Sequence, residues 1–310
     1  MRAFVTGATG FVGTAVVKEL LSAGHSVMGL ARSDSAAEQL KNQGAETVRG
    51  TIEDIDVLKK AASECDAVIH LAFIHDFANF RHCCEIDQTA IAAMGSAMVD
   101  AGGQRSLVIT SGTMGLEHGT LGVEDSEPEQ SSVLGATRGP SERICLDFAK
   151  KGIRASVVRL PPTTHGPGSS GFMGMYTSIA MQKGVAAYVG IGKNRWCAGH
   201  RDDAAKVYRL AMEKAVPGSV YHAVAEQGVM VKDIAAAVGK QLGIPSVCIT
   251  AEEAASHFGW FYFGVMADNI ASSERTKDSL GWNPTCPTVI EDVEVIIEFA
   301  KSQSREAKFL

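Results

Sequence analysis

Three observations predict an α/β protein with a doubly wound parallel sheet and a smaller C-terminal lobe. Short apolar runs alternate with helical segments through the first half of the chain, a glycine-rich turn follows the first apolar run, and the alternation changes after Leu160. The 310 residues suffice for one large domain carrying a smaller lobe. We expect residues 1–160 to form the sheet domain, and residues 161–198 and 225–310 to form the second lobe.

The expected elements follow one another in the order that parallel strand–helix–strand units require. Strands are expected where apolar residues run together, and helices where they recur every three or four positions. The expected strands are Ala3–Thr6, Ser26–Leu30, Glu46–Arg49, Ala67–Ala72, Ser106–Ser111, Ala155–Leu160 and Val220–Val224. The expected helices are Thr14–Ala23, Ser35–Asn42, Asp54–Glu64, Gln88–Ala101, about Ser131–Lys151 and one that begins at Asp203.

Local signals mark several of these boundaries. Gly24 ends the first helix, Asp54 is suited to capping the third, and Pro217-Gly218 closes the helix from Asp203. Gly139-Pro140 is expected to interrupt the helix over residues 131–151.

Residues 6–13 read TGATGFVG, between the first strand and the first helix. Gly7 permits a tight turn, Gly10 lets the backbone approach a pyrophosphate, and Gly13 lets the helix pack close to the strand. The helix N-terminus presents unpaired N–H groups and the positive end of its dipole to the phosphates. The segment predicts a dinucleotide site of the Rossmann type. Its expected residues are Gly7, Thr9, Gly10, Phe11, Val12 and Gly13.

The end of the second strand indicates which dinucleotide binds. An acidic residue about 20 positions after the glycine turn would hold the ribose 2′-hydroxyl of NAD, but Arg32 and Ser33 stand there. A guanidinium and a hydroxyl suit a 2′-phosphate, so we predict NADP(H). Two alternatives remain: Asp34 turns back onto the ribose, or Arg32 is a solvated loop residue.

Composition and charge exclude several classes of function. The 35 acidic residues outnumber the 29 basic ones, which are scattered, so no nucleic-acid partner is expected. The longest uncharged stretch, 160–182, is broken by prolines and glycines, so no membrane span is expected. The seven cysteines include no C-x-x-C pair, and His70, His75 and His82 lack carboxylates at ligand spacing, so no metal site is expected. We expect a cytoplasmic protein with reduced thiols.

Five segments match one family pattern, in its order, along nearly the whole chain. They are TGATGFVG, HLA at 70–72, TSG at 110–112, RLPPTTHGPG from Arg159 and GHRDDAA from Gly199. In these segments the chain resembles the short-chain dehydrogenase/reductase superfamily, in the extended or atypical branch that includes proteins named NAD-dependent epimerase/dehydratase. The resemblance implies a Rossmann-type domain with a smaller C-terminal substrate lobe, and it implies that residues 199–224, with the helix from Asp203, return to the Rossmann-type domain. It also implies further cofactor contacts at Ile52, Leu71, Ala72, Pro161 and Thr163.

The resemblance implies catalytic positions, one of which has lost its usual residue. In the family a Ser or Thr after the fifth strand orients a substrate carbonyl, and here Ser111 occupies that place, with Thr113 as a close substitute. A Tyr-x-x-x-Lys pair on the next helix donates a proton and holds the nicotinamide ribose. Leu134 stands in the Tyr position and Arg138 in the Lys position. Arg138 is expected to hold the ribose, but it cannot donate a proton at neutral pH. Asp87 stands where many members carry a structural Asn.

Three sources for the missing acid remain open. His165 occupies the place where the family often has the Tyr of a Tyr-Gly-Pro turn, and an imidazole transfers protons near pH 7. It is equally well explained as a turn residue. Tyr176 or Tyr188 would have to come from the second lobe. The last source is water, with Ser111 and Thr113 polarising the carbonyl.

An aromatic segment in the second lobe predicts how a substrate is covered. Residues 257–266, HFGWFYFGVM, hold five aromatic residues in a pattern that is neither alternating nor helical. We expect either a lid over a bulky apolar substrate or a packing hinge between the lobes. The expected substrate contacts are Phe73, His75, Met114, Tyr176, Arg195, Trp196, Trp260 and Tyr262.

Together these features predict an NADPH-dependent oxidoreductase that reduces a carbonyl or conjugated small molecule in a largely apolar and aromatic pocket. One alternative is an epimerase, dehydratase or lyase without net redox change. Another is a non-catalytic NADP(H)-sensing protein, which the lost tyrosine would permit. A monomer or a homodimer is expected, the latter through the helices at 88–101 and 131–151.

Overall fold

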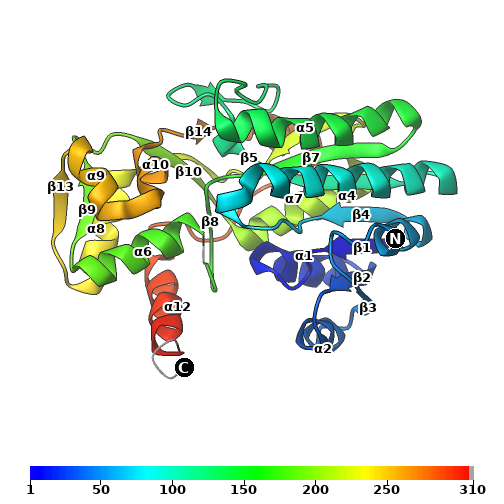
Figure 1. Ribbon diagram of the computed structural model, residues 1–310, viewed down its shortest axis with the longest axis horizontal. Coiled ribbons are helices and arrows are strands. Elements are labelled where there is room, and N and C mark those ends of the chain that lie inside the picture. Colours follow the sequence, from blue (N-terminus) through cyan, green and yellow to red (C-terminus); the bar gives the residue numbers. More distant parts are fainter. Residues whose placement is uncertain (170, 307–310) are drawn as a thin grey trace.

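A parallel sheet of seven strands forms the centre of the larger lobe (Figure 1). The computed structural model describes residues 1–169 and 171–306. The strand order is β11-β7-β5-β4-β1-β2-β3, and every pair is parallel. The strands are β1 (Arg2–Thr6), β2 (Ser26–Ala31), β3 (Glu46–Arg49), β4 (Ala67–His70), β5 (Ser106–Gly112), β7 (Arg154–Leu160) and β11 (Ser219–His222). The predicted doubly wound α/β fold is confirmed.

Helices cover both faces of this sheet, as buried parallel strands require. On one face lie α1 (Phe11–Ser22), α2 (Asp34–Asn42), α7 (Arg201–Lys214) and α11 (Glu274–Leu280). On the other lie α3 (Ile55–Glu64), α4 (Phe80–Ala101) and α5 (Val133–Asp147), and Figure 1 shows α4 and α5 running side by side. Alternate residues of β5 point to opposite faces: Leu107 and Ile109 face α3–α5, and Val108 faces α1 and α7.

The second lobe surrounds smaller sheets at the carboxyl end of the large one (Figure 1). Its strands and the short strands near it are β6 (Leu121–Gly122), β8 (Thr163–His165), β9 (Ala186–Val189), β10 (Arg195–His200), β12 (Glu226–Met230), β13 (Ser246–Ile249) and β14 (Ile270–Ala271). Its helices are α6 (Phe172–Lys183), α8 (Val231–Leu242), α9 (Ala251–Phe258), α10 (Tyr262–Met266) and α12 (Val293–Glu306). Short 3-10 turns are η1 (Phe77–Asn79), η2 (Thr113–Gly115), η3 (Phe148–Lys151) and η4 (Gly259–Phe261). Among the described residues, no helix has both the length and the apolar character needed to cross a bilayer.

Several boundaries differ from the expected ones. α4 begins at Phe80 rather than Gln88, because buried Cys83, Cys84 and Asp87 continue its inner face toward the N-terminus. α5 continues through Pro140, because tertiary contacts outweigh the lost backbone hydrogen bond. A Cβ at Gly135 would lie 2.2 Å from the carbonyl oxygen of Glu129, which shows how closely this helix packs on the preceding loop.

Part of the expected second lobe packs with the large sheet instead. Leu280 and Trp282 are buried in the core formed by α1, α2 and α7, and the Trp282 indole donates to the carbonyl oxygen of Asp203 at 2.9 Å. Asp203 itself accepts the backbone N–H groups of Thr285 and Cys286, while His200 caps α7. The assignment of all residues after 225 to the second lobe is therefore wrong for the segment around α11.

His222 on the edge strand β11 makes the stability of this sheet depend on pH. Its side chain is buried, its Nδ1 lies 2.8 Å from the carbonyl oxygen of Ser272, and its Nε2 lies 3.4 Å from the Arg159 guanidinium. Burial, assisted by the Arg159 cation, lowers the pKa of His222 to about 4. The unfolded chain takes up a proton near pH 6.5 while the folded chain does not, so folding is favoured less as the pH falls.

We therefore expect His222 to lower the free energy of unfolding by roughly 3 kcal/mol as the pH falls from 6.5 to 4. Urea unfolding at pH 7 and pH 4.5 measures the drop, which His222→Gln should reduce while the exposed control His118→Gln leaves it intact. An equal drop in wild type and His222→Gln would contradict this source.

Candidate active site

The glycine turn between β1 and α1 is a cradle that side chains would fill. Gly7 has φ +65°, in the region that favours glycine, and a Cβ at Gly13 would lie 2.0 Å from the carbonyl oxygen of Gly7. Gly10 caps α1 without any side-chain hydrogen bond, and no acidic residue lies in the first turn. The free N–H groups of Phe11 and Val12 at this helix end fit an anionic pyrophosphate.

The carboxyl ends of β2 and β3 carry two arginines. Arg32 is exposed, and no hydrogen bond or ion pair of its side chain occurs among the described residues. Asp34, the alternative ribose ligand, lies 3.4 Å from Arg49. The Ser33 hydroxyl accepts the Ala36 N–H at 3.2 Å and thereby caps α2. The predicted contact Ile52 is buried in the apolar core next to β2.

A buried chain of hydrogen bonds runs from the glycine turn to α4. The Thr6 hydroxyl accepts the N–H groups of Leu71 and Ala72, both at 3.2 Å, so its own proton goes to His70 Nδ1 at 2.7 Å. His70 Nε2 is then the protonated nitrogen, and it donates to Asp87 at 3.2 Å. His70 thus ties the cofactor turn to Asp87.

Arg138 lies at the end of this chain. Its guanidinium donates to Asp87 Oδ2 at 2.8 Å and to the carbonyl oxygen of Thr110 at 2.8 Å, and it lies 4.5 Å from the ring centre of Phe73. Ser141, one turn further along α5, donates to the same carboxylate oxygen at 2.6 Å. The guanidinium also contacts the Cys84 thiol, and the Arg138 side chain is 17% exposed, so part of its donor surface remains open to a ligand.

The charge of Asp87 is stabilised although the side chain is almost completely buried. Burial alone would raise the pKa of Asp87, but the Arg138 cation and the hydrogen bonds from His70 and Ser141 outweigh it, so the pKa lies below its usual value. Asp87 and Arg138 therefore form an ion pair at neutral pH, and the charge of the guanidinium is balanced.

Ser111 and Thr113, which the sequence places together, have different surroundings. Ser111 shares with Leu107 and Ile109 the face of β5 that α4 and α5 cover, so it lies on the Arg138 side of the sheet. No hydrogen bond of its hydroxyl occurs among the described residues. Thr113 is fully buried and donates to Asn269 Oδ1 at 2.8 Å. The structure contradicts a catalytic role for Thr113, because its hydroxyl proton holds Asn269.

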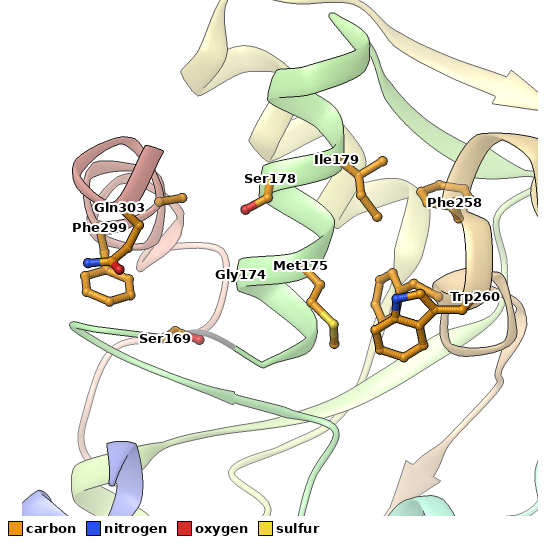
Figure 2. Close-up of a pocket in the computed structure, with 11 residues that line it drawn as sticks. Ser169, Gly174, Met175, Ser178, Ile179, Phe258, Trp260, Phe299 and Gln303 are labelled. Atoms are coloured by element: carbon orange, nitrogen blue, oxygen red, sulfur yellow. The ribbon is translucent and has the colours of Figure 1, made fainter. Parts of the chain in front are cut away.

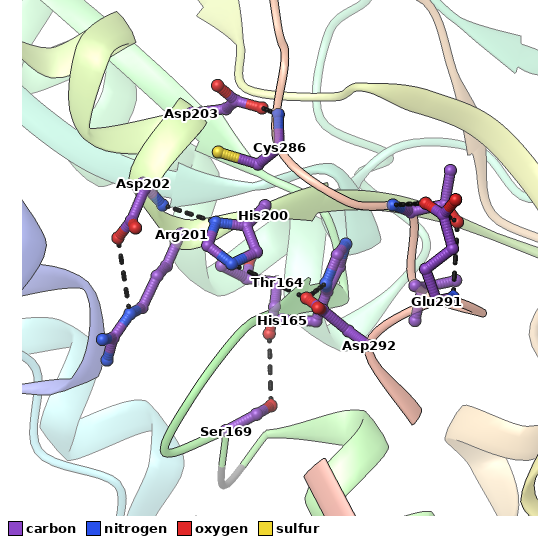
Figure 3. Close-up of polar contacts among 12 residues, drawn as sticks. Thr164, His165, Ser169, His200, Arg201, Asp202, Asp203, Cys286, Glu291 and Asp292 are labelled. Carbon is purple, nitrogen blue, oxygen red and sulfur yellow. Dashed lines mark hydrogen bonds and ion pairs between the residues drawn. The ribbon is translucent and has the colours of Figure 1, made fainter. Parts of the chain in front are cut away.

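His165 is not placed to act as the missing acid. Its ring is fully buried, with Nδ1 2.6 Å from Asp292 and Nε2 3.8 Å from Glu226, and it lies edge-on to His200 (Figure 3). These partners tie β8, β10 and β12 to the loop before α12. The predicted acid role is therefore wrong, because the imidazole lies in a closed polar cluster.

Two predicted substrate contacts are also internal. Tyr176 is fully buried and donates to the carbonyl oxygen of Ala187 at 2.7 Å, and burial raises its pKa. Trp196 is fully buried and its indole donates to the carbonyl oxygen of Gly264 at 2.9 Å. These two side chains build the second lobe, so the predictions that they contact substrate are wrong. Arg195 pairs with Asp268 through two hydrogen bonds of 3.0 and 2.8 Å but keeps 37% of its side chain exposed, and its contact with substrate stays a prediction.

Of the other predicted contacts, Phe73 and His75 lie closest to Arg138. Phe73 stacks beneath the guanidinium, His75 is exposed 5.4 Å from the Phe73 ring, and Met114 is half-buried in η2 directly after β5. Trp260 and Tyr262 are exposed. The segment 257–266 is largely helical, contrary to the pattern read from its sequence: Phe258, Phe261 and Val265 are core residues of the second lobe, while Trp260, Tyr262 and Phe263 are exposed, and its role as a lid stays a prediction.

Two cofactor contacts predicted from the family lie in the buried start of the second lobe. Pro161 and Thr163 follow β7, and Thr163 is fully buried with its hydroxyl unpartnered among the described residues. Leu71 and Ala72 lie against the turn, since a Cβ at Gly7 would be 2.7 Å from the Ala72 nitrogen.

Sequence reasoning missed two residues that complete the site. Arg201 lies at the start of α7 with its guanidinium 5.1 Å from the Phe11 ring, and a positive charge inside GHRDDAA was the available signal. Phe77 lies in η1 and stacks on Trp260 with ring centres 5.1 Å apart. The spacing of Phe77 and Phe80 was the available signal, because residues three apart lie on the same side of a helical turn.

A family model described as the NAD dependent epimerase/dehydratase family matches residues 3–224, which include the glycine turn, the β5 end and α5. The chain belongs to this family. Its predicted resemblance is thereby confirmed, and so is the use of a nicotinamide cofactor, which the glycine turn fits. The family consists of oxidoreductases, epimerases and dehydratases, and so the chain is assigned to a family of enzymes.

Relatives of this family member match between 71% and 98% of its length. An uncharacterized protein of Schizosaccharomyces pombe is 46% identical over 294 residues, covering 94% of this chain and 98% of the relative. A 4-hydroxy-2-methyl-3-oxo-4-farnesyl-3,4-dihydroquinoline-1-oxide ketoreductase of Stigmatella aurantiaca is 27% identical over 71% of this chain and 67% of its own. A UDP-glucose 4-epimerase of Thermotoga maritima, solved with UDP-glucose, shares the fold with a TM-score of 0.78 at 20% identity, over 98% of this chain and 100% of that one.

Proposed function

We propose that this protein is an NADPH-dependent reductase of a carbonyl or conjugated small molecule. The observation that carries the proposal is the pair of hydrogen-bond donors beside the carboxyl end of β5. Ser111 has no hydrogen-bond partner for its hydroxyl among the described residues, and Arg138 donates to the carbonyl of the residue just before it while its side chain stays 17% exposed. Donors held rigidly at this place would stabilise negative charge that develops on a carbonyl oxygen.

In this proposal Ser111, Arg138 and Asp87 have different roles. Ser111 and Arg138 donate to the acceptor oxygen or to the nicotinamide ribose, and Asp87 holds Arg138 in position. When bound, NADPH supplies the hydride. The proton comes from water, because Leu134 stands in the tyrosine position and Arg138 stays protonated at neutral pH. Balanced charge at Asp87 and Arg138 favours a neutral acceptor over an anionic one.

NADPH oxidation by the purified protein with a panel of aromatic ketones and enones tests the proposal, with NADH in parallel. Consumption of NADPH with formation of the reduced product supports it. Conversion of substrate without net loss of NADPH would replace it with the second candidate, a non-redox epimerase, dehydratase or lyase, which the similarity to the Thermotoga maritima epimerase favours. NADPH binding without any conversion would favour an NADP(H)-sensing protein.

The preference for NADPH over NADH is a separate proposal that depends on Arg32. The Asp34 carboxylate, which would hold the 2′-hydroxyl of NAD, lies 3.4 Å from Arg49, and Arg32 is free to meet a phosphate. Replacing Arg32 by alanine should raise the Kd of NADPH roughly 10- to 100-fold, the effect of losing a hydrogen bond to a charged group. The Kd of NADH should not change.

Fluorescence titration of both cofactors measures these constants. Lys41→Ala, an exposed cation in the last turn of α2, is the matched control and should leave both unchanged. If Arg32→Ala weakened the binding of NADPH and of NADH equally, Arg32 would not contact the 2′-phosphate.

A further inference from the structure

A cavity of about 370 Å³ lies in the second lobe, between α6, α12 and the segment formed by α9 and η4 (Figure 2). Its walls include Met175 and Ile179 from α6, Phe258 and Trp260 from the aromatic segment, and Phe299 from α12. No charged residue lines it, and its polar side chains are two serines and a glutamine. A volume and lining of this kind suit an apolar group of a small molecule.

Trp260 connects this cavity to the candidate active site. Trp260 lines the cavity, and its ring also stacks on the Phe77 ring, with ring centres 5.1 Å apart and 29° between the ring planes. Phe77 in turn stacks on Phe80 at 6.2 Å, and Phe80 lies 5.8 Å from Phe73. Since the Arg138 guanidinium lies over Phe73, a continuous row of rings leads from the active-site cation to the cavity wall.

The row of rings passes from one lobe to the other at the contact between Phe77 and Trp260, and about half of each side chain is exposed there. Phe77 follows β4 of the large sheet, whereas Trp260 belongs to the second lobe, and each is 54% exposed. The remaining faces of two large rings at this junction are therefore open to a ligand. Contact with a flat apolar molecule would cover area that now faces water.

We propose that the cavity binds the apolar part of an extended, neutral aromatic ketone or enone, which reaches it along the aromatic row. This inference rests on the proposed function, because it takes the ligand to be the acceptor whose oxygen lies at Ser111 and Arg138. Trp260 is then a specificity-determining residue: it contacts the acceptor at the entrance to the cavity. Small aliphatic ketones leave the cavity unfilled and bind weakly.

Tryptophan fluorescence reports this binding without any turnover. Of the three tryptophans, Trp196 and Trp282 are buried and Trp260 is exposed, so quenching by acrylamide reports chiefly on Trp260. The neutral planar ketone 2-acetonaphthone is the probe, added to the full-length protein saturated with NADP⁺. We expect saturable protection of Trp260 from acrylamide, which Trp260→Phe abolishes while equilibrium dialysis still detects the bound probe.

Filling the cavity gives the decisive comparison. Ser178→Phe places a ring at the cavity lining, and the control Gln241→Phe places the same ring at an exposed position of α8, a helix that contributes nothing to the residues lining this cavity. Ser178→Phe should raise the Kd of 2-acetonaphthone about tenfold or more, with the Kd of NADPH unchanged, and Gln241→Phe should change neither. Met175→Ala, which removes part of the wall, should also weaken the probe and provides a second variant.

The outcomes separate this inference from the proposed function. Probe binding that Ser178→Phe weakens, in a protein that never oxidises NADPH, would support the cavity and overturn the reductase. Reduction of 2-acetonaphthone with the same KM in wild type, Ser178→Phe and Met175→Ala would support the reductase and overturn the cavity.

Discussion

Replacement of Asp87 by alanine is expected to lower the free energy of unfolding by about 3–5 kcal/mol, the cost of breaking a buried ion pair from one side. The carboxylate is 1% exposed and accepts from Arg138, His70 and Ser141 at 2.8, 3.2 and 2.6 Å. Alanine removes all three acceptor contacts at once. The guanidinium then lacks its counter-charge, and the protonated nitrogen of His70 loses its acceptor.

Urea unfolding of the wild type and the variant at pH 7 measures this effect. Asp147→Ala is the matched control, because it removes an exposed carboxylate that pairs with Lys150 in an i,i+3 contact, and it should change the free energy of unfolding far less than Asp87→Ala does. The double variant Asp87→Leu/Arg138→Met should recover much of the lost stability, since it leaves no unpaired charge. Equal effects of Asp87→Ala and Asp147→Ala would disprove the structural role of the pair.

Acid should weaken the same network. Because the pKa of folded Asp87 lies below its usual value, its contribution is complete above the unfolded pKa near 4 and is lost as the pH falls through the lower folded pKa. This loss lies at lower pH than the one assigned to His222, so the two residues act in different parts of an acid titration.

Replacement of Ser111 by alanine is expected to lower kcat about 100- to 1000-fold with the acceptor that the panel identifies, while the Kd of NADPH stays unchanged. That is the usual cost of one oxyanion-stabilising donor. The hydroxyl is 6% exposed, lies on the Arg138 side of the sheet, and has no hydrogen-bond partner among the described residues. It is therefore available to an acceptor oxygen, and alanine removes it with little change in packing.

Thr113→Val is the matched control for Ser111→Ala. It removes a neighbouring hydroxyl that donates to Asn269, so it should reduce stability but leave kcat of the folded protein unchanged. Steady-state kinetics with NADPH, together with thermal unfolding of each variant, distinguish the two effects. A Ser111→Ala variant with full turnover would remove Ser111 from the mechanism, and Arg138 would remain as the polarising donor.

The features of the fold that depend on residues close together in the sequence could be predicted from the sequence. TGATGFVG predicted the turn after β1 because the backbone there needs residues without a Cβ, and the structure confirms close approaches at Gly7 and Gly13. The periodicity of apolar residues predicted the parallel sheet because it, too, depends only on neighbouring residues. Periodicity failed at α4, where the buried polar Asp87 interrupts an apolar face, and at α5, where Pro140 contradicts a helix that tertiary packing maintains.

The candidate site was accessible only in part. Family spacing located Ser111 and Arg138, but it also selected His165, Trp196 and Tyr176, all of which are buried and hydrogen-bonded inside the second lobe. A sequence shows that a side chain is able to donate a proton or stack on a ligand. Whether an internal partner already uses that ability depends on residues far away along the chain, such as Asp292 for His165.

The sequence by itself determined the cofactor turn, the parallel order of strands and helices, and the loss of the usual tyrosine, because each depends on neighbouring residues or on one position. Only the tertiary structure decided that Asp87 balances the charge of Arg138 and that Phe77 meets Trp260 across the two lobes. These contacts join residues 51 and 183 positions apart, and their energies arise from burial and charge compensation, which exist only once the chain has folded.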